Sequence, residues 1–257
     1  LHSCIRLTCD AQSGAIRNTG NYSSGELTVA TTTDEDGNLH ITFTDRLGNT
    51  ILDRRGSEGN WLDTYYVYDN SGLLQAVLPP KATIPQEGSA VSTDDINRLA
   101  YLYRYDSRDR MSARKLPGCE WEYMAYDRAG RRIFYQDGKL RSQGKTRFEV
   151  FDRLGRSCLQ GICNSTNIDF DAINASQMTV TAQWAGDTNL LKGYTIYAEN
   201  GSMPALTNVQ ITSATYYDNY DFLGKNGVPQ VSGSSPAIFG NAKGMATGKL
   251  TAVYNCS

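Results

Sequence analysis

Side chains that commonly perform catalysis are scarce in this sequence. Its two histidines, His2 and His40, leave few candidates for a general base or a histidine-ligated metal. His40 stands in NLHITFTD, which is typical of a strand, and a histidine in a strand is usually structural. Paired carboxylates occur in TDED, TDD and DFD, where a turn or a helix cap favours an acid. We therefore predict no enzymatic activity and no catalytic residues; a glycan-cleaving enzyme with two catalytic carboxylates is the weaker alternative.

The six cysteines form no recognisable metal site. CIRLTC and CLQGIC each place four residues between two cysteines, but IRLT reads as a strand and not as the tight turn that zinc ligands need. An even number is compatible with disulfides in an exported protein and equally with buried free thiols. DEDGN lacks the glycine and glutamate offsets of a calcium loop, and GNAKGMATGK lacks the strand and hydroxyl of a phosphate-binding loop. The sequence predicts neither a metal nor a cofactor.

Aromatic side chains are the remaining candidates for binding. Trp61, Trp121 and Trp184 are either core residues or rings that stack on a ligand such as a sugar. A carbohydrate-binding cell-surface module is therefore the alternative from a different functional class. The near balance of 25 basic and 27 acidic side chains removes the electrostatic argument for nucleic acid as a partner. Because no run of about 18 apolar residues is present, no membrane span is predicted.

The dominant pattern is a repeat of short strands that end in an aspartate. TYYVYDNSGLL, YLYRYDSRDR and WEYMAYDRAGRR place aromatic residues ahead of that aspartate. Successive aspartates lie 21 to 25 residues apart wherever nothing is inserted. A glycine follows three residues later in five of six cases, and Asp109 takes its place in the sixth. The predicted turn residues are Asp45 and Gly48, Asp69 and Gly72, Asp106, Asp127 and Gly130, Asp152 and Gly155, and Asp221 and Gly224.

This spacing has a physical cause in the β-turn. Aspartate is favoured at the first position of a type I turn because its carboxylate accepts hydrogen bonds from the N–H groups ahead of it. Glycine is favoured at the fourth position, where the chain leaves with positive φ and enters an antiparallel strand. Each unit is therefore predicted to be a hairpin. The position four residues before the aspartate is always apolar or aromatic, which predicts a core face, and the ring before the aspartate is expected to pack across strands on the other face.

The predicted fold class is all-β with little helix, in which antiparallel hairpins form a continuous twisted or spiralling sheet. The abundance of glycine (24) and tyrosine (16) agrees with strands joined by tight turns.

These sequence repeats resemble the YD repeats of bacterial Rhs-type proteins. The resemblance rests on YVYDNSGLLQAVLPP, YRYDSRDRMSARKLPG, YMAYDRAGRRIFYQDG and VFDRLGRSC. They look like the family's pattern of Tyr-Asp, two variable residues, glycine and then a basic residue, which each of them follows at most positions. It implies a β-sheet wound as a spiral strip into a hollow shell, which in many members encloses a C-terminal toxin. The implied function is a non-enzymatic structural segment of a secreted or surface protein, part of a β-shell or scaffold that encapsulates a C-terminal toxin or mediates surface interaction. The family's self-cleaving segment carries an Asp-Pro dipeptide, which this sequence lacks.

The organisation along the chain follows from the repeat. We treat residues 1–257 as a single β-rich segment, with the clearest repeats in residues 39–160, an insertion at residues 79–98, and flanking strands and loops in residues 161–257. Thr93 ahead of Asp94 and Asp95 predicts a short N-capped helix. The expected partners are the remainder of the same polypeptide, including a C-terminal toxin, and glycans or cell-surface proteins. Exposed strand edges are expected to favour self-association.

Overall fold

The computed structural model describes residues 3–10, 13–164, 168–186, 191–225, 227–229 and 242–252. The chain forms two compact units: unit 1 is Leu1–Trp121 and unit 2 is Glu122–Ser257. The prediction of an all-β fold built from antiparallel hairpins is confirmed, because 13 strands belong to one sheet and the helices are short. No helix in the described part of the chain is long and apolar enough to cross a membrane.

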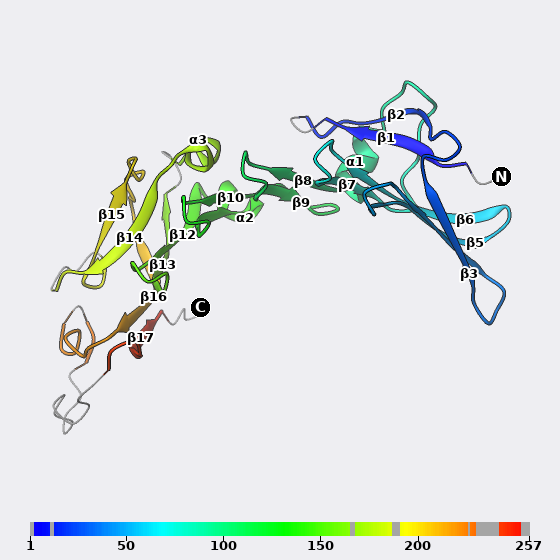
Figure 1. Cartoon of the computed structure of the whole chain (residues 1–257). Helices are drawn as coiled ribbons and strands as arrows, with labels where there is room; N and C mark the ends of the chain where they lie inside the picture. Colours follow the sequence, from blue (N-terminus) through cyan, green and yellow to red (C-terminus); the bar gives the residue numbers. More distant parts are fainter. Residues whose placement is uncertain are drawn as a thin grey trace, which may run out of the picture. The chain divides into compact units, whose positions relative to one another are not determined.

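Unit 1 contains a sheet whose antiparallel strands follow one another in chain order, and a separate two-stranded sheet formed by β1 and β2. The β1–β2 hairpin lies over one face of the larger sheet (Figure 1). The elements are β1 (Ile5–Cys9), β2 (Ile16–Asn21), β3 (Thr28–Thr33), β4 (Leu39–Thr44), β5 (Thr50–Ser57), β6 (Asn60–Tyr68), β7 (Leu74–Leu78), α1 (Thr93–Leu99), β8 (Tyr101–Tyr105) and β9 (Met111–Lys115).

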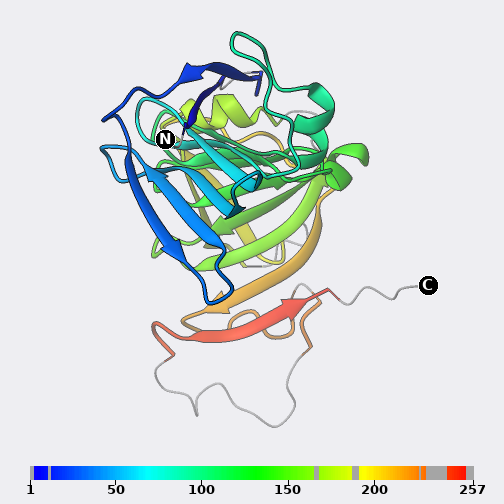
Figure 2. The ribbon, with the colours of Figure 1, turned by 90° about the vertical axis from the view of Figure 1, so that its right-hand side faces the viewer.

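Unit 2 repeats this plan, with β14 and β15 forming the separate hairpin. Strands β16 and β17, orange and red in Figure 2, lie side by side although a long segment separates them in the chain. The elements are β10 (Glu122–Tyr126), β11 (Arg132–Gln136), α2 (Gly138–Ser142), β12 (Lys145–Phe151), β13 (Ser157–Asn164), α3 (Phe170–Ala175), β14 (Thr179–Trp184), β15 (Tyr194–Glu199), β16 (Gln210–Tyr217) and β17 (Ala246–Thr251).

Each unit buries one face of its part of the sheet beneath its separate hairpin. In unit 1, cross-strand neighbours Phe43, Leu52, Tyr65 and Leu78 form a buried row, because alternate residues of a strand share a face. The β1–β2 hairpin closes this core with Ile16 and its neighbours. The corresponding core of unit 2 includes Phe134, Phe148, Val150, Leu159, Val180, Ala182 and Tyr194.

The helices begin where short polar side chains can cap them. α1 begins at Thr93, as expected, but its cap is Ser92, whose hydroxyl accepts the Asp95 N–H at 3.0 Å. α3 is capped by Asp169 and is held to β10 by the buried Asn174. The Asn174 amide donates to the Met124 carbonyl and its oxygen accepts the Tyr126 N–H, both at 2.9 Å.

Five hairpins of the sheet turn in the same way at the aspartates of the repeat. The aspartate N–H donates to the carbonyl four residues ahead, and its own carbonyl accepts the N–H of the third residue, at distances between 2.9 and 3.2 Å. The third residue has positive φ throughout: +88° at Gly48, +78° at Gly130 and +59° at Asp109. The pairing register shifts by one residue directly before each turn, which is the bulge that accompanies this loop. The five aspartates are Asp45, Asp69, Asp106, Asp127 and Asp152.

The sixth turn lies at a different aspartate from the one chosen from the sequence. Strand β16 ends at Tyr217, and the N–H of Asp218 donates to the Met245 carbonyl at the start of β17. Asp221 instead lies in a separate turn, where its N–H donates to Asn219 Oδ1, although Gly224 does have positive φ. YDNYDF contains Tyr-Asp twice, and glycine spacing favours the second, whereas strand pairing selects the first.

We expect Gly155→Val to lower the free energy of unfolding by about 1–3 kcal/mol, as measured by urea denaturation. A Cβ on Gly155 would meet nothing within 4 Å, so the cost comes from the backbone at φ +81° and not from a clash. The matched control is Asp109→Gly, which should be neutral or stabilising because Asp109 already holds φ +59°. A Gly155→Val protein as stable as wild type would contradict the role assigned to this turn.

Candidate functional site

The turn carboxylates use both oxygens, and the first oxygen organises the turn backbone. Oδ1 of Asp45, Asp69, Asp106 and Asp152 accepts the N–H groups two and four residues ahead at 2.8 to 3.1 Å. Oδ1 of Asp127 accepts the Arg131 N–H at 3.0 Å. These bonds satisfy backbone donors that the strand ladder does not reach, and so they fix the loop conformation.

The second oxygen accepts a hydrogen bond from a side chain downstream of the turn. Asp45 Oδ2 accepts the Asn49 amide and Asp69 Oδ2 accepts the Gln75 amide, at 3.0 and 2.9 Å. In the later hairpins the partner is an arginine four residues after the aspartate. The Nε to Oδ2 distances are 2.7 Å for Arg110 to Asp106, 3.0 Å for Arg131 to Asp127 and 2.6 Å for Arg156 to Asp152.

In unit 2 the turn arginines also reach the next hairpin. Arg131 donates to the Asp152 carbonyl at 3.1 Å, and its guanidinium lies 5.4 Å from the centre of the Phe151 ring. Arg156 donates to both oxygens of Asp218, at 3.0 and 2.6 Å, and lies 4.3 Å from the centre of the Tyr217 ring. We call Asp127, Arg131, Asp152, Arg156 and Asp218 the turn ladder. It joins three successive turns, the first two through a hydrogen bond from Arg131 to a main-chain carbonyl and the last two through the ion pair of Arg156 with Asp218.

The turn ladder is most buried at Asp127. The Asp127 side chain is fully buried and Arg131 is 15% exposed, whereas Arg156 and Asp218 are 22% and 39% exposed. Strand β14 covers the buried end, since Arg131 donates to the Val180 carbonyl at 2.6 Å. Asp218 is the most exposed member of the turn ladder, and its hydrogen bond from Arg156 lowers the pKa of its carboxyl to about 2.

The aromatic residues before the turns are half-buried and hold neighbouring hairpins together. The Tyr105 hydroxyl donates to the Leu74 carbonyl at 3.0 Å, and the Tyr217 hydroxyl donates to the Ser157 carbonyl at 2.9 Å. Leu74 and Ser157 occupy the same position, the first residue of the strand that follows a turn. Burial raises the pKa of Tyr105, in keeping with a packed ring.

Each of the three candidate ligand-stacking tryptophans packs against a core, Trp61 and Trp121 in unit 1 and Trp184 in unit 2. Trp61 and Trp121 flank the core of unit 1, where Arg54 lies 5.5 Å from the Trp61 ring centre and Arg104 lies 4.2 Å from that of Trp121. Guanidinium groups are therefore close to both rings.

Trp184 has a different environment and lines a cavity. It packs edge-on against Tyr194 and Tyr216, with ring centres 5.8 and 5.6 Å away. It also borders a space of about 270 Å³ with Arg156, Asp218, Gln183 and Tyr217. The cavity brings one candidate tryptophan to the exposed end of the turn ladder.

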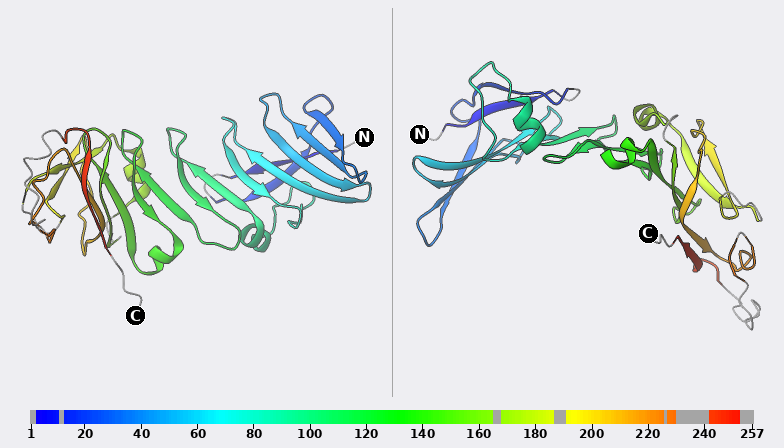
Figure 3. Two further views of the ribbon diagram at one scale, coloured as in Figure 1. Left: turned by 90° about the horizontal axis from the view of Figure 1, so that it is seen from below. Right: turned by 180° about the vertical axis from the view of Figure 1, so that it is seen from behind.

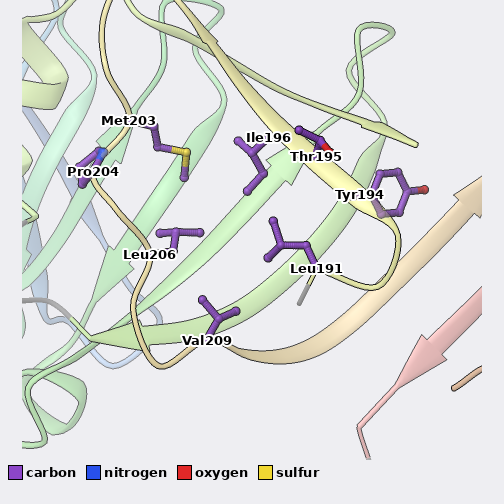
Figure 4. A pocket seen from close by; sticks show the side chains of 8 residues that line it. All are labelled: Leu191, Tyr194, Thr195, Ile196, Met203, Pro204, Leu206 and Val209. Atoms are coloured by element: carbon purple, nitrogen blue, oxygen red, sulfur yellow. The ribbon is translucent and has the colours of Figure 1, made fainter. Parts of the chain in front are cut away.

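A second cavity, of about 430 Å³, lies beside β15 in the same unit. Figure 4 shows Leu191 and Ile196 facing Met203, Leu206 and Val209, which belong to the segment between β15 and β16. Its lining is mostly apolar, and several of these side chains also pack against the buried core of unit 2. It is the flank of a core rather than a cluster of reactive groups.

His40 lacks the geometry of a triad base, and the Cys4 and Cys158 thiols are buried. His40 Nε2 lies 2.9 Å from Asp53 and 3.5 Å from the Thr42 hydroxyl, whereas a hydrolase triad uses two different ring nitrogens for the acid and the nucleophile. Burial raises the pKa of Cys4 to about 12 and of Cys158 to about 11, which opposes thiolate formation. The five cysteines within the described residues are free thiols, and no cluster of metal-ligating side chains occurs among those residues. His2 and Cys256 lie outside them.

Sequence reasoning found the turn aspartates and a basic residue after the glycine, but it did not predict that Arg131 and Arg156 bind the aspartates, and it chose Asp221 instead of Asp218. The arginines had a local signal, since each follows its aspartate by four residues. Asp218 follows Tyr217 and so carries the same Tyr-Asp signal as the other turns, but its pairing with Arg156, 62 positions away, has no local signal.

We expect Asp127→Ala to lower the free energy of unfolding by about 3 kcal/mol, because it leaves the partly buried Arg131 without its carboxylate. Chemical denaturation measures the change. The control is Asp34→Ala in the β3–β4 turn, where an exposed aspartate makes the same kind of bonds to Asn38 and the loss should be clearly smaller. Equal losses would show that the turn ladder adds nothing to the turn itself.

The ion pair between Arg156 and Asp218 predicts that the stability of the folded protein depends on pH in the acidic range. The pKa of Asp218 is lowered from 3.8 to about 2 on folding, so its stabilisation is present above pH 3.8 and disappears as the pH falls towards 2. The difference in unfolding temperature between wild type and Asp218→Asn should therefore be largest near neutral pH and shrink over that interval. A difference that does not depend on pH would exclude the ionised pair as its source.

Comparison with known proteins gives only a distant similarity. No family model matches this chain, and no curated protein matches it. The crystal structure of TcdB2-TccC3-TEV is similar with a TM-score of 0.45 and 12% identity, over 95% of this chain and 10% of that chain. The crystal structure of TcdB2-TccC3 without the hypervariable C-terminal region has a TM-score of 0.40 and 14% identity, over 92% of this chain and 12% of that chain. This chain thus spans about a tenth of the length of each.

Proposed function

We propose that this chain is a non-enzymatic structural segment of a secreted or surface-displayed bacterial protein of the Rhs type, and that it forms part of a β-shell enclosing a C-terminal toxin. The turn ladder is the observation that carries the proposal. Its arginines hydrogen-bond to the next hairpin and so hold successive hairpins together, as the continuous sheet of a β-shell requires.

The hydrogen bonding of the repeat carboxylates favours a structural segment of a β-shell and not an enzyme. The repeat carboxylates are engaged by backbone N–H groups and by arginine or amide side chains, which leaves them poorly suited to act as proton donors or nucleophiles. The glycan-cleaving alternative would need two carboxylates free to face a glycosidic bond. Activity assays on polysaccharides test that alternative directly.

The second candidate, a carbohydrate-binding module, is favoured by the cavity at Trp184. It combines an aromatic ring with Gln183, Arg156 and Asp218, the kinds of groups that bind sugar rings and hydroxyls. A glycan array with wild type and Gln183→Ala separates this candidate from the wall, because Gln183 is exposed and its loss should not affect folding. Glycan binding that disappears in the variant would favour the module.

Protease protection tests the wall in the polypeptide that contains this segment. If the segment closes a shell, sequence that follows it should resist proteolysis in wild type and become sensitive in a variant with Asp127→Ala and Asp152→Ala, because the turns that hold adjacent hairpins would loosen. The control is Gln183→Ala, which should leave protection unchanged. Equal sensitivity of the following sequence in wild type and in the double variant would count against the shell.

A further inference from the structure

Strand β3 is the end strand of the sheet in unit 1 and presents a free edge. It pairs with β4 without a register shift from Thr28 opposite Thr44 to Thr33 opposite Leu39, and no second strand pairs with it within the described residues. All six of its residues are exposed. Figure 3 (left) shows β3, in blue, as the strand at the end of the larger sheet of unit 1. Unpaired N–H and C=O groups along such an edge are a template for another strand.

The side chains of β3 do not protect this edge. Its sequence, TVATTT, has no charge, no proline and no glycine, and five of its six residues are β-branched. Natural edge strands are usually blocked by lysine, proline or a bulge. β17, the end strand of the sheet in unit 2, carries Lys249 and Gly248 and has a register shift at Tyr217. The two end strands therefore differ in how open they are to pairing.

The core is also open next to β3. A cavity of about 530 Å³ is lined by Cys4, Tyr22, Leu27, Val29 and Phe43 together with small polar residues. Val29, on β3, is 45% exposed although it lies opposite the buried Phe43. A strand added beyond β3 would cover this flank while it satisfied the backbone edge.

We propose that β3 is a self-association edge, at which it pairs antiparallel with β3 of a second copy of this chain. An antiparallel pair of identical strands requires a twofold axis normal to the sheet, so the core faces of both copies lie on the same side. Odd-numbered residues then lie opposite odd-numbered residues. Val29 therefore meets Thr31 or Thr33 of the second copy, on the side of the open cavity.

A second copy fits this edge because β3 is complementary to itself. Small β-branched side chains suit cross-strand pairs, and the absence of charge on β3 removes repulsion between two identical strands. The inference rests on the proposed scaffold function for its biological use, since end-to-end pairing would extend a β-wall.

The test is a concentration series of the 257-residue chain in analytical ultracentrifugation, with Thr31→Lys and Thr31→Glu as variants. Wild type should form a dimer whose fraction increases with concentration. Each variant alone should dissociate at least about tenfold more readily, because the two like charges lie directly opposite or diagonally across the axis in the two registers. An equimolar mixture of the two variants should recover the dimer. Thr31 is exposed, so the unfolding midpoints should stay at the wild-type value.

Ala246→Lys, at an exposed position on β17, is the matched control and should leave the dimer intact. A wild type that stays monomeric throughout the series, or a Thr31→Lys variant that dimerises as well as wild type, would overturn the inference. Dissociation caused by Ala246→Lys would overturn it as well. Neither result bears on the protease-protection experiment, in which the turn variants carry an intact β3, so failure of the edge and failure of the scaffold function are distinguishable.

Discussion

The rest of the structure depends on the aspartate carboxylate that closes each hairpin. One oxygen collects backbone N–H groups that the strand ladder leaves unpaired, and the other fixes a side chain four to six residues further on. The turn then places a residue with positive φ and a bulge at the same point in each of these hairpins, which sets the register of the strands. A slip of one residue would move each apolar row to solvent, so the cores depend on the turns.

The turn ladder converts this local device into contact between hairpins. Arginine serves because its planar fork can reach a carboxylate in its own turn and a second acceptor in the next. Asn49 and Gln75, in unit 1, satisfy their own aspartate with a neutral amide. The hairpins thus share one turn geometry and differ in the side chain that supports it, which is an amide in the first two and an arginine from Arg110 onward. The ladder gains most where β14 shields it, since burial strengthens the attraction between opposite charges.

Each unit solves the same packing problem with its separate hairpin. A sheet with one apolar face needs a cover, and β1–β2 and β14–β15 supply it. In unit 1 the insertion at residues 79–98 adds to the cover, because Asn18 and Ile16 of β2 bond to Ser89 and Val91. The cover stops short at β3, where Val29 and the cavity beside it mark the open border of the core.

The sequence by itself determined the turns, the strand-rich fold and one apolar face, because these depend on residues a few positions apart. Asp69 and Gly72, or Asp152 and Gly155, carry their own turn in four residues. Only the tertiary structure decided that Asp218, and not Asp221, ends β16, and that Arg156 binds it from 62 positions away. It also decided that Trp61, Trp121 and Trp184 pack against cores, because a tryptophan reads the same in sequence whether or not another element covers it. Those outcomes depend on strand pairing and on the covering hairpins, and no local pattern encodes them.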